Sequence, residues 1–191
     1  MTRQQTQKLA TWLITGTAVV VIFPIVLVVV YVIVKGIGTV DWEFLTQPPS
    51  NGMTEGGIFP ALLGTLILTF GTAIAAIPLA IGAAIYLAEY AGDNRITRTI
   101  RLAIVNLAGI PSIVYGLFGL GMFVLFLNFG TSILAGALTL GLMTLPVVIS
   151  TAEEAILAVP SEFRVVSLSL GASRWQTIRH QVLPHALPGI I

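Results

Sequence analysis

The side chains that could carry out chemistry are few in this sequence, and they do not form a catalytic arrangement. The 191 residues include nine basic and eight acidic side chains, two histidines and no cysteine. His180 and His185 lie on either side of Pro184, a poor spacing for two ligands of one metal ion. Glu153 and Glu154 are adjacent, and neighbouring side chains on a helix point about 100° apart, so they cannot act as a carboxylate pair. The sequence therefore predicts no catalytic residue, no metal site and no cofactor bound by this chain.

A polar segment, residues 161–184, lies between two long apolar stretches. Pro160 should end or kink the helix before it, and Ser161 is a good N-cap for a new helix. Gly171 suits the left-handed residue that follows a helix end. The run Ser173–Gln176 is typical of a capping box. The segment is therefore predicted to form a helix, a glycine hinge and a second helix.

The first of these two helices would carry two apolar sides. At about 100° per residue, Phe163, Val166 and Leu170 share one side, while Val165 and Leu168 lie roughly opposite. Outside the membrane each apolar side needs a neighbour, so we expect one to rest on the chain's own membrane domain and the other on a separate protein. A connector lying on lipid headgroups is an alternative that composition leaves equally open. The apolar alternation is also compatible with a short strand, although no second strand is evident to pair with it.

The elements that position this segment are membrane spans. Hydrophobic residues make up 56% of the chain and charged residues 9%, whereas about a quarter of a soluble domain is charged. Uncharged runs separate Lys8 from Lys35, Glu55 from Glu89 and Arg101 from Glu153. Each is longer than the roughly 20 residues that cross a bilayer. The chain is predicted to be an all-α integral membrane protein, a polytopic bundle of transmembrane helices. Its net charge of +1 indicates no nucleic-acid partner.

Four complete spans and the start of a fifth are expected. A turn at residues 128–132 divides the longest uncharged run into two spans. The first span resembles a signal peptide at its basic start, but it is too long and has no small-residue cleavage site. The spans are predicted near Leu9–Val34, Gly64–Ala88, Leu102–Leu127 and Ile133–Thr151, with a fifth opening at Leu183.

The loop between the first two spans, residues 36–57, should contain local structure. Asp41 is expected to cap a short helix that carries Trp42 and Phe44, aromatic residues suited to the membrane interface. Turns are expected at Pro48–Pro49 and Asn51–Gly52.

The second span should be kinked by Pro78, and it carries small residues at four-residue spacing. Such a stripe lets another helix pack closely, although lipid-facing alanine is equally compatible at any single position. The stripe comprises Gly71, Ala75, Ala80, Ala84 and Ala88.

The basic residues predict an orientation. With a cytoplasmic N-terminus, eight of the nine lie on the cytoplasmic side and only Lys35 lies outside. The polar segment is then cytoplasmic, the arginines after Asp93 form a second loop that sets this topology, and Glu153 and Glu154 form a solvated helix end. The eight are Arg3, Lys8, Arg95, Arg98, Arg101, Arg164, Arg174 and Arg179.

The polar segment resembles the EAA loop of ABC-importer permeases, whose pattern is E-A-A-x3-G-x9-I-x-L-P. Gly171, Leu183 and Pro184 match this pattern. The chain departs from it at residues 165–167, where Val-Val-Ser replaces E-A-A, and at Gln181, which replaces the isoleucine. In that family the loop is a coupling helix that docks on an ATP-hydrolysing subunit.

Four further stretches resemble the PstA family of phosphate-specific permeases, including "TQPPSNGMTEGGIFPALLGTL" and "GAAIYLAEYA". They cover residues 46–66, 82–91, 110–120 and 159–190. The resemblance implies a permease subunit of an ATP-driven inorganic phosphate importer in the bacterial inner membrane. Its partners would be a PstC-like sister permease, a PstB-like ATPase dimer that holds ATP and Mg²⁺, and a PstS-like periplasmic binding protein. The permease itself would not be an enzyme.

The resemblance also implies a domain plan. Residues 1–57 would form the N-terminal helix and a periplasmic loop, and residues 58–191 part of a permease domain with its coupling loop at 152–184. Members of the family have six spans, so most of the fifth and all of the sixth would follow Ile191. The residues assigned to ATPase coupling are Glu162, Phe163, Arg164, Val166, Leu170, Gly171, Ala172, Arg174, Leu183 and Pro184.

The substrate path is less marked in the sequence. The predicted spans contain no Arg, Lys or His that could face a phosphate anion. In the PstA family an R-x-x-G-E-T-A-P-L stretch follows in the fifth span, which would lie after Ile191. Ser112, beside Pro111, is the candidate contact, although a serine in this position more commonly bonds to its own helix backbone.

Other functions fit the sequence less well. A permease for another solute, such as a PstC-like, molybdate, sulfate or amino-acid permease, would keep the coupling loop but lose the matches at 46–66 and 110–120. A channel would leave the docking loop unexplained. An intramembrane enzyme would need ionisable residues at membrane depth, and the predicted spans have none.

Overall fold

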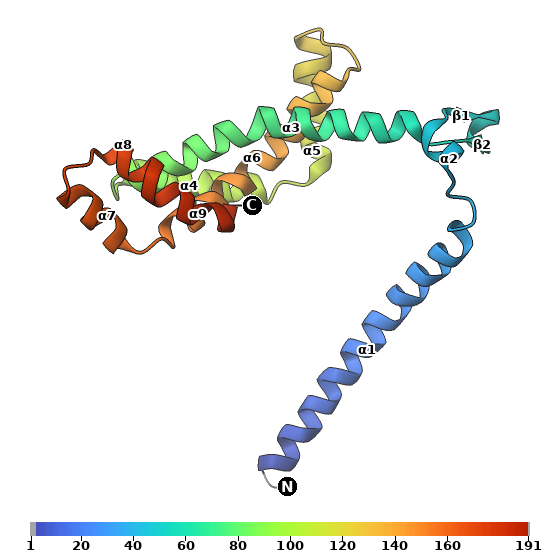
Figure 1. Cartoon of the computed structure of the whole chain (residues 1–191), viewed down its shortest axis with the longest axis horizontal. Helices are drawn as coiled ribbons and strands as arrows, with labels where there is room; N and C mark the ends of the chain where they lie inside the picture. Colours follow the sequence, from blue (N-terminus) through green and yellow to red (C-terminus); the bar gives the residue numbers. More distant parts are fainter. Residues whose placement is uncertain (1–2, 191) are drawn as a thin grey trace. The chain divides into compact units, whose positions relative to one another are not determined.

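The computed structural model describes residues 3–190, and the described chain is almost entirely helical (Figure 1). It divides into two compact units that meet at Leu62 and Leu63, and each is described by itself. Three described helices are long and apolar enough to cross a membrane, and a bent pair of helices makes a fourth candidate. The prediction of an all-α polytopic membrane protein is confirmed. The three are Thr11–Gly36, Phe59–Tyr90 and Ile133–Leu157, and the bent pair is Arg95–Ala108 with Ser112–Phe126.

The first unit opens with a long apolar helix, α1 (Arg3–Gly36), which contains the predicted first span. After a turn, Asp41 caps the short helix α2 (Trp42–Thr46): the Phe44 N–H donates to its Oδ1 at 2.7 Å. A helix start leaves such N–H groups without a backbone partner, which is why an aspartate is favoured there. The predicted cap is confirmed.

A small hairpin follows α2. β1 (Pro49–Ser50) pairs antiparallel with β2 (Glu55–Gly56) around the 3₁₀ turn η1 (Asn51–Met53). Gly52 has φ +68°, a left-handed value that favours glycine, so the turn predicted at Asn51–Gly52 is confirmed. The sequence did not predict the two strands, which are too short to show an apolar alternation.

The second candidate span is α3 (Phe59–Ile85), which continues through Pro78 and ends in a π-helical turn, η2 (Tyr86–Tyr90). It includes the predicted span Gly64–Ala88. Its small residues pack against another helix: a Cβ added at Gly71 would lie 3.0 Å from the Ala137 Cβ. Ala80 and Ala84 are fully buried. The predicted packing stripe is confirmed.

The predicted third span, Leu102–Leu127, is not one continuous helix. The chain forms α4 (Arg95–Ala108), then α5 (Ser112–Gly119) and the π-helical η3 (Leu120–Phe126), and the axis turns by 96° at the break. Pro111 causes the break because it has no N–H to donate and disfavours a helical conformation in the residue before it.

The prediction of a basic loop after Asp93 is also wrong. Asn94 caps α4, its Oδ1 accepting the Thr97 N–H at 2.9 Å. An asparagine side chain in this position satisfies a backbone donor that has no helical partner, which starts the helix early. The three arginines predicted for the loop therefore lie on α4.

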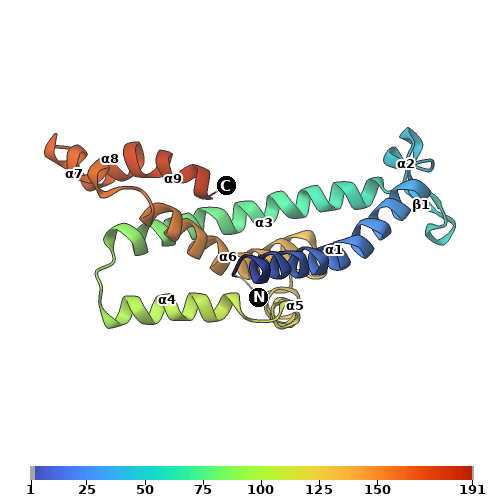
Figure 2. The same cartoon turned by 90° about the horizontal axis from the view of Figure 1, so that it is seen from below.

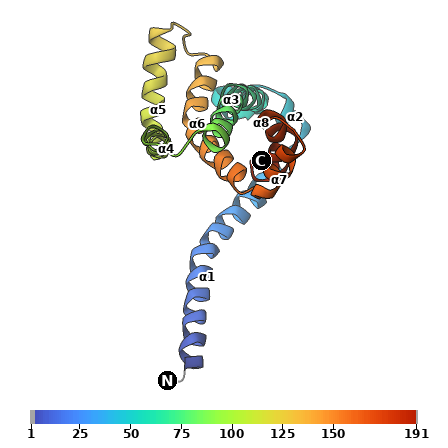
Figure 3. The same cartoon turned by 90° about the vertical axis from the view of Figure 1, so that its left-hand side faces the viewer.

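The centre of the second unit is α6 (Ile133–Leu157), which covers the predicted fourth span and extends beyond it. It lies between α3 and α5 (Figure 3), and it also contacts α4 and α9 (Figure 2). Glycines allow these approaches: a Cβ added at Gly119 of α5 would lie 2.1 Å from the Thr139 Oγ1 of α6. A Cβ at Gly189 of α9 would lie 3.0 Å from the Ala155 Cβ.

The chain continues from α6 into α7 (Ser161–Ser169), α8 (Arg174–Thr177), the π-helical η4 (Ile178–Val182) and α9 (Leu183–Ile190). Ile178 and Val182 pack with Ala84, Ala152 and Ile156 in one apolar cluster. This cluster fixes η4 and α9 against the ends of α3 and α6, and it leaves α7 at the margin of the unit.

Candidate functional site

The polar segment forms the predicted helix, hinge and second helix, with one correction at its start. Pro160, not Ser161, occupies the N-cap position of α7, and no side chain caps this helix. Pro160 has ψ 139°, an extended conformation, so the helix starts one residue earlier than a serine cap requires. Glu162 lies in the first turn, where a carboxylate interacts favourably with the helix dipole.

Gly171 ends α7 as predicted. Its φ is +85°, in the left-handed region, and the N–H groups of Gly171 and Ala172 donate to the carbonyls of Leu168 and Ser167 at 3.0 and 3.2 Å. These two bonds make a Schellman motif, which satisfies the last carbonyls of the helix. No atom lies within 4 Å of a Cβ added at Gly171, so the backbone conformation alone requires the glycine.

The capping box at the start of α8 is confirmed. The Gln176 N–H donates to the Ser173 Oγ at 3.3 Å, and the Ser173 N–H donates to the Gln176 Oε1 at 2.7 Å. Because α7 and α8 are both helical, the strand alternative for the first helix is wrong.

A polar border of α7 attaches it to the rest of the second unit. Arg164 Nε and Nη2 donate to the Glu89 Oε1 at 2.9 and 2.7 Å, and Nη2 also donates to the Ile156 carbonyl at 2.9 Å. One turn further on, the Ser167 and Thr177 hydroxyls lie 2.9 Å apart. Polar contacts therefore attach α7 to the end of α3, the end of α6 and α8.

Both apolar sides of α7 remain largely open. The helix has no buried residue, and the exposed fraction is 84% for Leu170 and 62% for Val165. Phe163 is partly covered by the His185 ring, whose centroid lies 4.5 Å from its own. The expectation that one apolar side rests on the chain's own membrane domain is met only in part: Phe163 contacts His185 of α9, and the rest of that side is exposed. Arg164 makes the contacts with Glu89 at the end of α3 and with the Ile156 carbonyl of α6, whereas Ser167 contacts Thr177 of α8.

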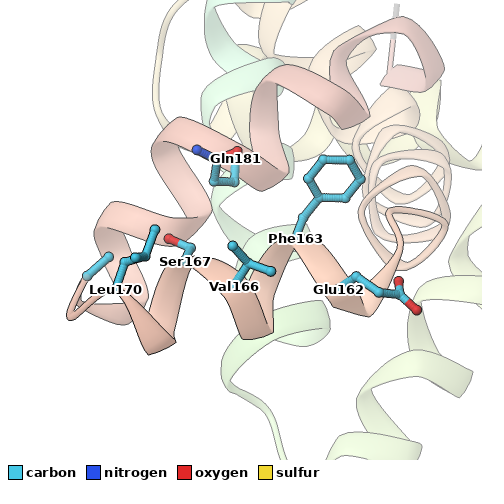
Figure 4. A pocket seen from close by; sticks show the side chains of 7 residues that line it. Glu162, Phe163, Val166, Ser167, Leu170 and Gln181 are labelled. Atoms are coloured by element: carbon cyan, nitrogen blue, oxygen red, sulfur yellow. The ribbon is translucent and has the colours of Figure 1, made fainter.

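An open pocket of about 420 Å³ lies along the first apolar side (Figure 4). Phe163, Val166 and Ser167 extend from α7 toward the helix that carries Gln181, whereas the Glu162 carboxylate points away from it. The wall is mostly apolar, with polar groups from Ser167 and Gln181. The lining residues are Glu162, Phe163, Val166, Ser167, Leu170, Ala172 and Gln181.

The structure thus brings together part of the predicted coupling set. Glu162, Phe163, Val166, Leu170 and Ala172 share the pocket. The other members lie elsewhere: Arg164 is in the ion pair, Arg174 is exposed at the start of α8, and Leu183 and Pro184 begin α9. Leu183 packs against the apolar cluster.

A second ion pair corrects the prediction for Glu153. Arg101 Nε donates to the Glu153 Oε1 at 2.8 Å, and Arg101 Nη2 donates to the Leu87 carbonyl at 3.0 Å. Glu153 is buried, not solvated, because α4 packs beside α6 and provides Arg101 as its partner. Glu154 is exposed as expected. Sequence reasoning also missed Glu89. The one sequence feature that draws attention to Glu89 is its position at the end of a long uncharged run.

Ser112 lies directly after the break between α4 and α5, as the first residue of α5. It is exposed, and no described residue hydrogen-bonds to its hydroxyl. Within residues 3–190 the structure has no group of three or more His, Cys, Asp or Glu side chains that could hold a metal ion.

Comparison with known proteins identifies the class. Over residues 76–191 the chain matches the family described as "Binding-protein-dependent transport system inner membrane component", and it belongs to this family. The family is one of multi-pass transport permeases, not of enzymes.

The more particular similarity is to phosphate permeases. The chain is 36% identical to the "Phosphate transport system permease protein PstA 1" of Mycobacterium tuberculosis, over 99% of this chain and 63% of that protein. It is 38% identical to the "Probable ABC transporter permease protein YqgI" of Bacillus subtilis, over 100% of this chain and 65% of that protein. The resemblance to the PstA family is confirmed, and the chain spans a little under two thirds of the length of these relatives.

Proposed function

We propose that this chain is a permease subunit of an ATP-driven inorganic phosphate importer. It forms the translocation path with a PstC-like sister permease and receives phosphate from a PstS-like binding protein. A PstB-like ATPase dimer, which holds ATP and Mg²⁺, docks on the segment from α7 to α8. The similarity to PstA 1 supports phosphate as the substrate.

The observation that carries the docking proposal is the way in which α7 is held. Polar contacts on one border attach it, and two apolar sides stay exposed beside an apolar pocket of about 420 Å³. Binding of another protein over such surfaces is favourable, because it lowers the free energy by about 25 cal/mol for each Å² of apolar surface removed from water. The Arg164 contacts would also keep α7 attached when a partner exerts force on it.

The orientation follows from the same end of the second unit. Two ion pairs lie there: Arg164 with Glu89 joins α7 to the end of α3, and Arg101 with Glu153 joins α4 to α6. Clustered basic residues favour the cytoplasmic side, so we infer that this end of the second unit is cytoplasmic, and Arg3 and Lys8 favour the same side for the N-terminus.

The substrate path is proposed to pass the break between α4 and α5. A broken helix exposes backbone groups that can contact an anion, and Ser112 adds a free hydroxyl at that point. A positive charge for the anion would come from the sister subunit or from another part of the permease, since residues 9–34, 64–88, 102–127 and 133–151 contain no Arg, Lys or His.

The test is ATP-coupled transport in vesicles that contain the complete transporter. Gly171→Val forces a β-branched residue into a left-handed backbone conformation, at a cost of about 1–3 kcal/mol, and distorts the end of α7. We expect ATP hydrolysis without phosphate uptake. Gly130→Val is the matched control, because Gly130 also has a positive φ (+64°) and open space around it but lies before α6, far from α7 in the sequence.

Two outcomes count against the proposal. Uptake that is unchanged in Gly171→Val, or reduced equally in both variants, removes the docking role of the segment. ATP-driven uptake of molybdate, sulfate or an amino acid in place of phosphate keeps the docking role and overturns the substrate.

A further inference from the structure

Arg164 lies where the start of α7, the end of α6 and the π-helical end of α3 meet. A guanidinium has five N–H donors, and here each has an acceptor. Two donate to the Glu89 Oε1, and three donate to the carbonyls of Ile156, Val159 and Pro160, the last at 3.5 Å. A side chain bound in this way has almost no rotational freedom left, so it fixes the angle at which α7 leaves α6.

The contacts are also shielded from water. The exposed fraction is 21% for the Arg164 side chain and 12% for the Glu89 side chain. Charge-assisted hydrogen bonds are stronger in such a setting than at an open surface. The carbonyls at the end of α6 carry the negative end of its dipole, which favours the same cation.

Glu89 lies on η2, the π-helical turn at the end of α3. The Ala91 N–H donates to the Tyr86 carbonyl five residues earlier, at 2.8 Å, which widens this turn. A π-helical turn changes the direction of the side chains that follow it, and such turns occur often at functional sites. Here the turn carries the carboxylate that binds Arg164.

We propose that Glu89 and Arg164 are a positioning pair that makes α7 move as one body with the ends of α3 and α6. Force applied to α7 then reaches two membrane spans directly. The contact between α7 and the end of α3 joins two distant parts of the sequence, because Glu89 and Arg164 are 75 residues apart. This inference rests on the proposed function, since it needs an ATP-driven partner on α7.

The second ion pair offers a matched control. Arg101 and Glu153 are 2.8 Å apart, and the Glu153 side chain is also 12% exposed. This pair joins α4 to α6 and does not touch α7. Glu89→Gln and Glu153→Gln each remove one buried carboxylate charge while keeping shape and an acceptor oxygen, so a general loss of stability would affect both.

The experiment uses the complete transporter in lipid nanodiscs, with spin labels on cysteines at Tyr86 and Ser169, which lies on α7 outside its two apolar sides. Both side chains are exposed, and the chain has no cysteine of its own. We expect the same distance between the labels with and without ATP in the otherwise unaltered chain and in Glu153→Gln. In Glu89→Gln the distance should shift or broaden on ATP binding. Phosphate taken up per ATP hydrolysed should fall by about tenfold in Glu89→Gln, with little change in Glu153→Gln.

The inference is overturned if the distance changes with ATP in the unaltered chain, or if Glu89→Gln keeps both its distance and its coupling. It is also overturned if the two glutamine variants lose coupling equally. The distance measurement does not depend on phosphate. A transporter that moves another solute would therefore overturn the proposed substrate and leave this result in place.

Discussion

The consecutive helices α6 and α7 are separated by three residues, and the chain holds them in different ways. Glycine and alanine bring the neighbours of α6 within van der Waals distance, and α6 contributes eight buried residues, seven of them uncharged. α7 has no buried residue, and an arginine and a serine attach it. The first arrangement suits a helix that stays packed in a membrane bundle.

The second arrangement suits a helix that binds a partner protein. Contacts on a single border fix its direction while its apolar sides stay free to bind another protein. Substitutions on the exposed sides of α7 should therefore change binding without changing folding, and substitutions at the close contacts of α6 should do the reverse.

The largest effect is expected for Leu170→Asp on α7. Leu170, the residue that directly follows α7, lines the pocket and is 84% exposed, so its replacement should change thermal unfolding little. A charge in the apolar centre of an interface should weaken binding of the ATPase by about thirtyfold, which corresponds to about 2 kcal/mol. Val165→Asp, on the opposite side of α7, should have a smaller effect. Titration of the purified ATPase onto the permease measures both, and unchanged affinity in Leu170→Asp would exclude the pocket side as the docking surface.

An effect of comparable size, on stability rather than on binding, is expected for Gly119→Ala at the contact of α5 with α6. The added Cβ would lie 2.1 Å from the Thr139 Oγ1, which already donates to the Ala135 carbonyl at 2.7 Å. Overpacking of this kind costs about 1–3 kcal/mol. Gly116→Ala on the same helix has open space and serves as the control, and it should be neutral or slightly stabilising. Thermal unfolding in detergent compares them; equal melting temperatures would show that α5 does not pack tightly on α6.

The smallest effect is expected for Ser112→Ala, which lies on neither the packed surface of α6 nor the border of α7. Folding and ATPase binding should be unchanged. If its hydroxyl contacts the substrate, the loss of one hydrogen bond should slow uptake by about two- to tenfold. Initial rates of radiolabelled phosphate uptake decide this, and an unchanged rate removes Ser112 from the path.

Local signals allowed much of the structure to be predicted. Uncharged runs located α1, α3 and α6, because hydrocarbon excludes unpaired charges over a fixed length. The Asp41 cap, the Gly171 hinge and the Ser173 capping box were predictable since each depends on hydrogen bonds within a few residues.

Contacts between distant residues could not be predicted in the same way. Arg101 and Glu153 are 52 residues apart, and nothing in the sequence pairs them before α4 and α6 are placed. The break at Pro111 shows a further limit. A proline within an apolar run predicts a kink, but it does not predict a turn of 96° between the two helix axes.

The most direct test of the docking surface is photo-crosslinking from Val166 and Leu170 in the complete transporter during ATP-driven transport. Both positions are exposed and line the pocket on α7. The account predicts covalent products between these positions and the ATPase subunit. Crosslinks only to lipid or to the chain itself, while transport continues, would contradict it.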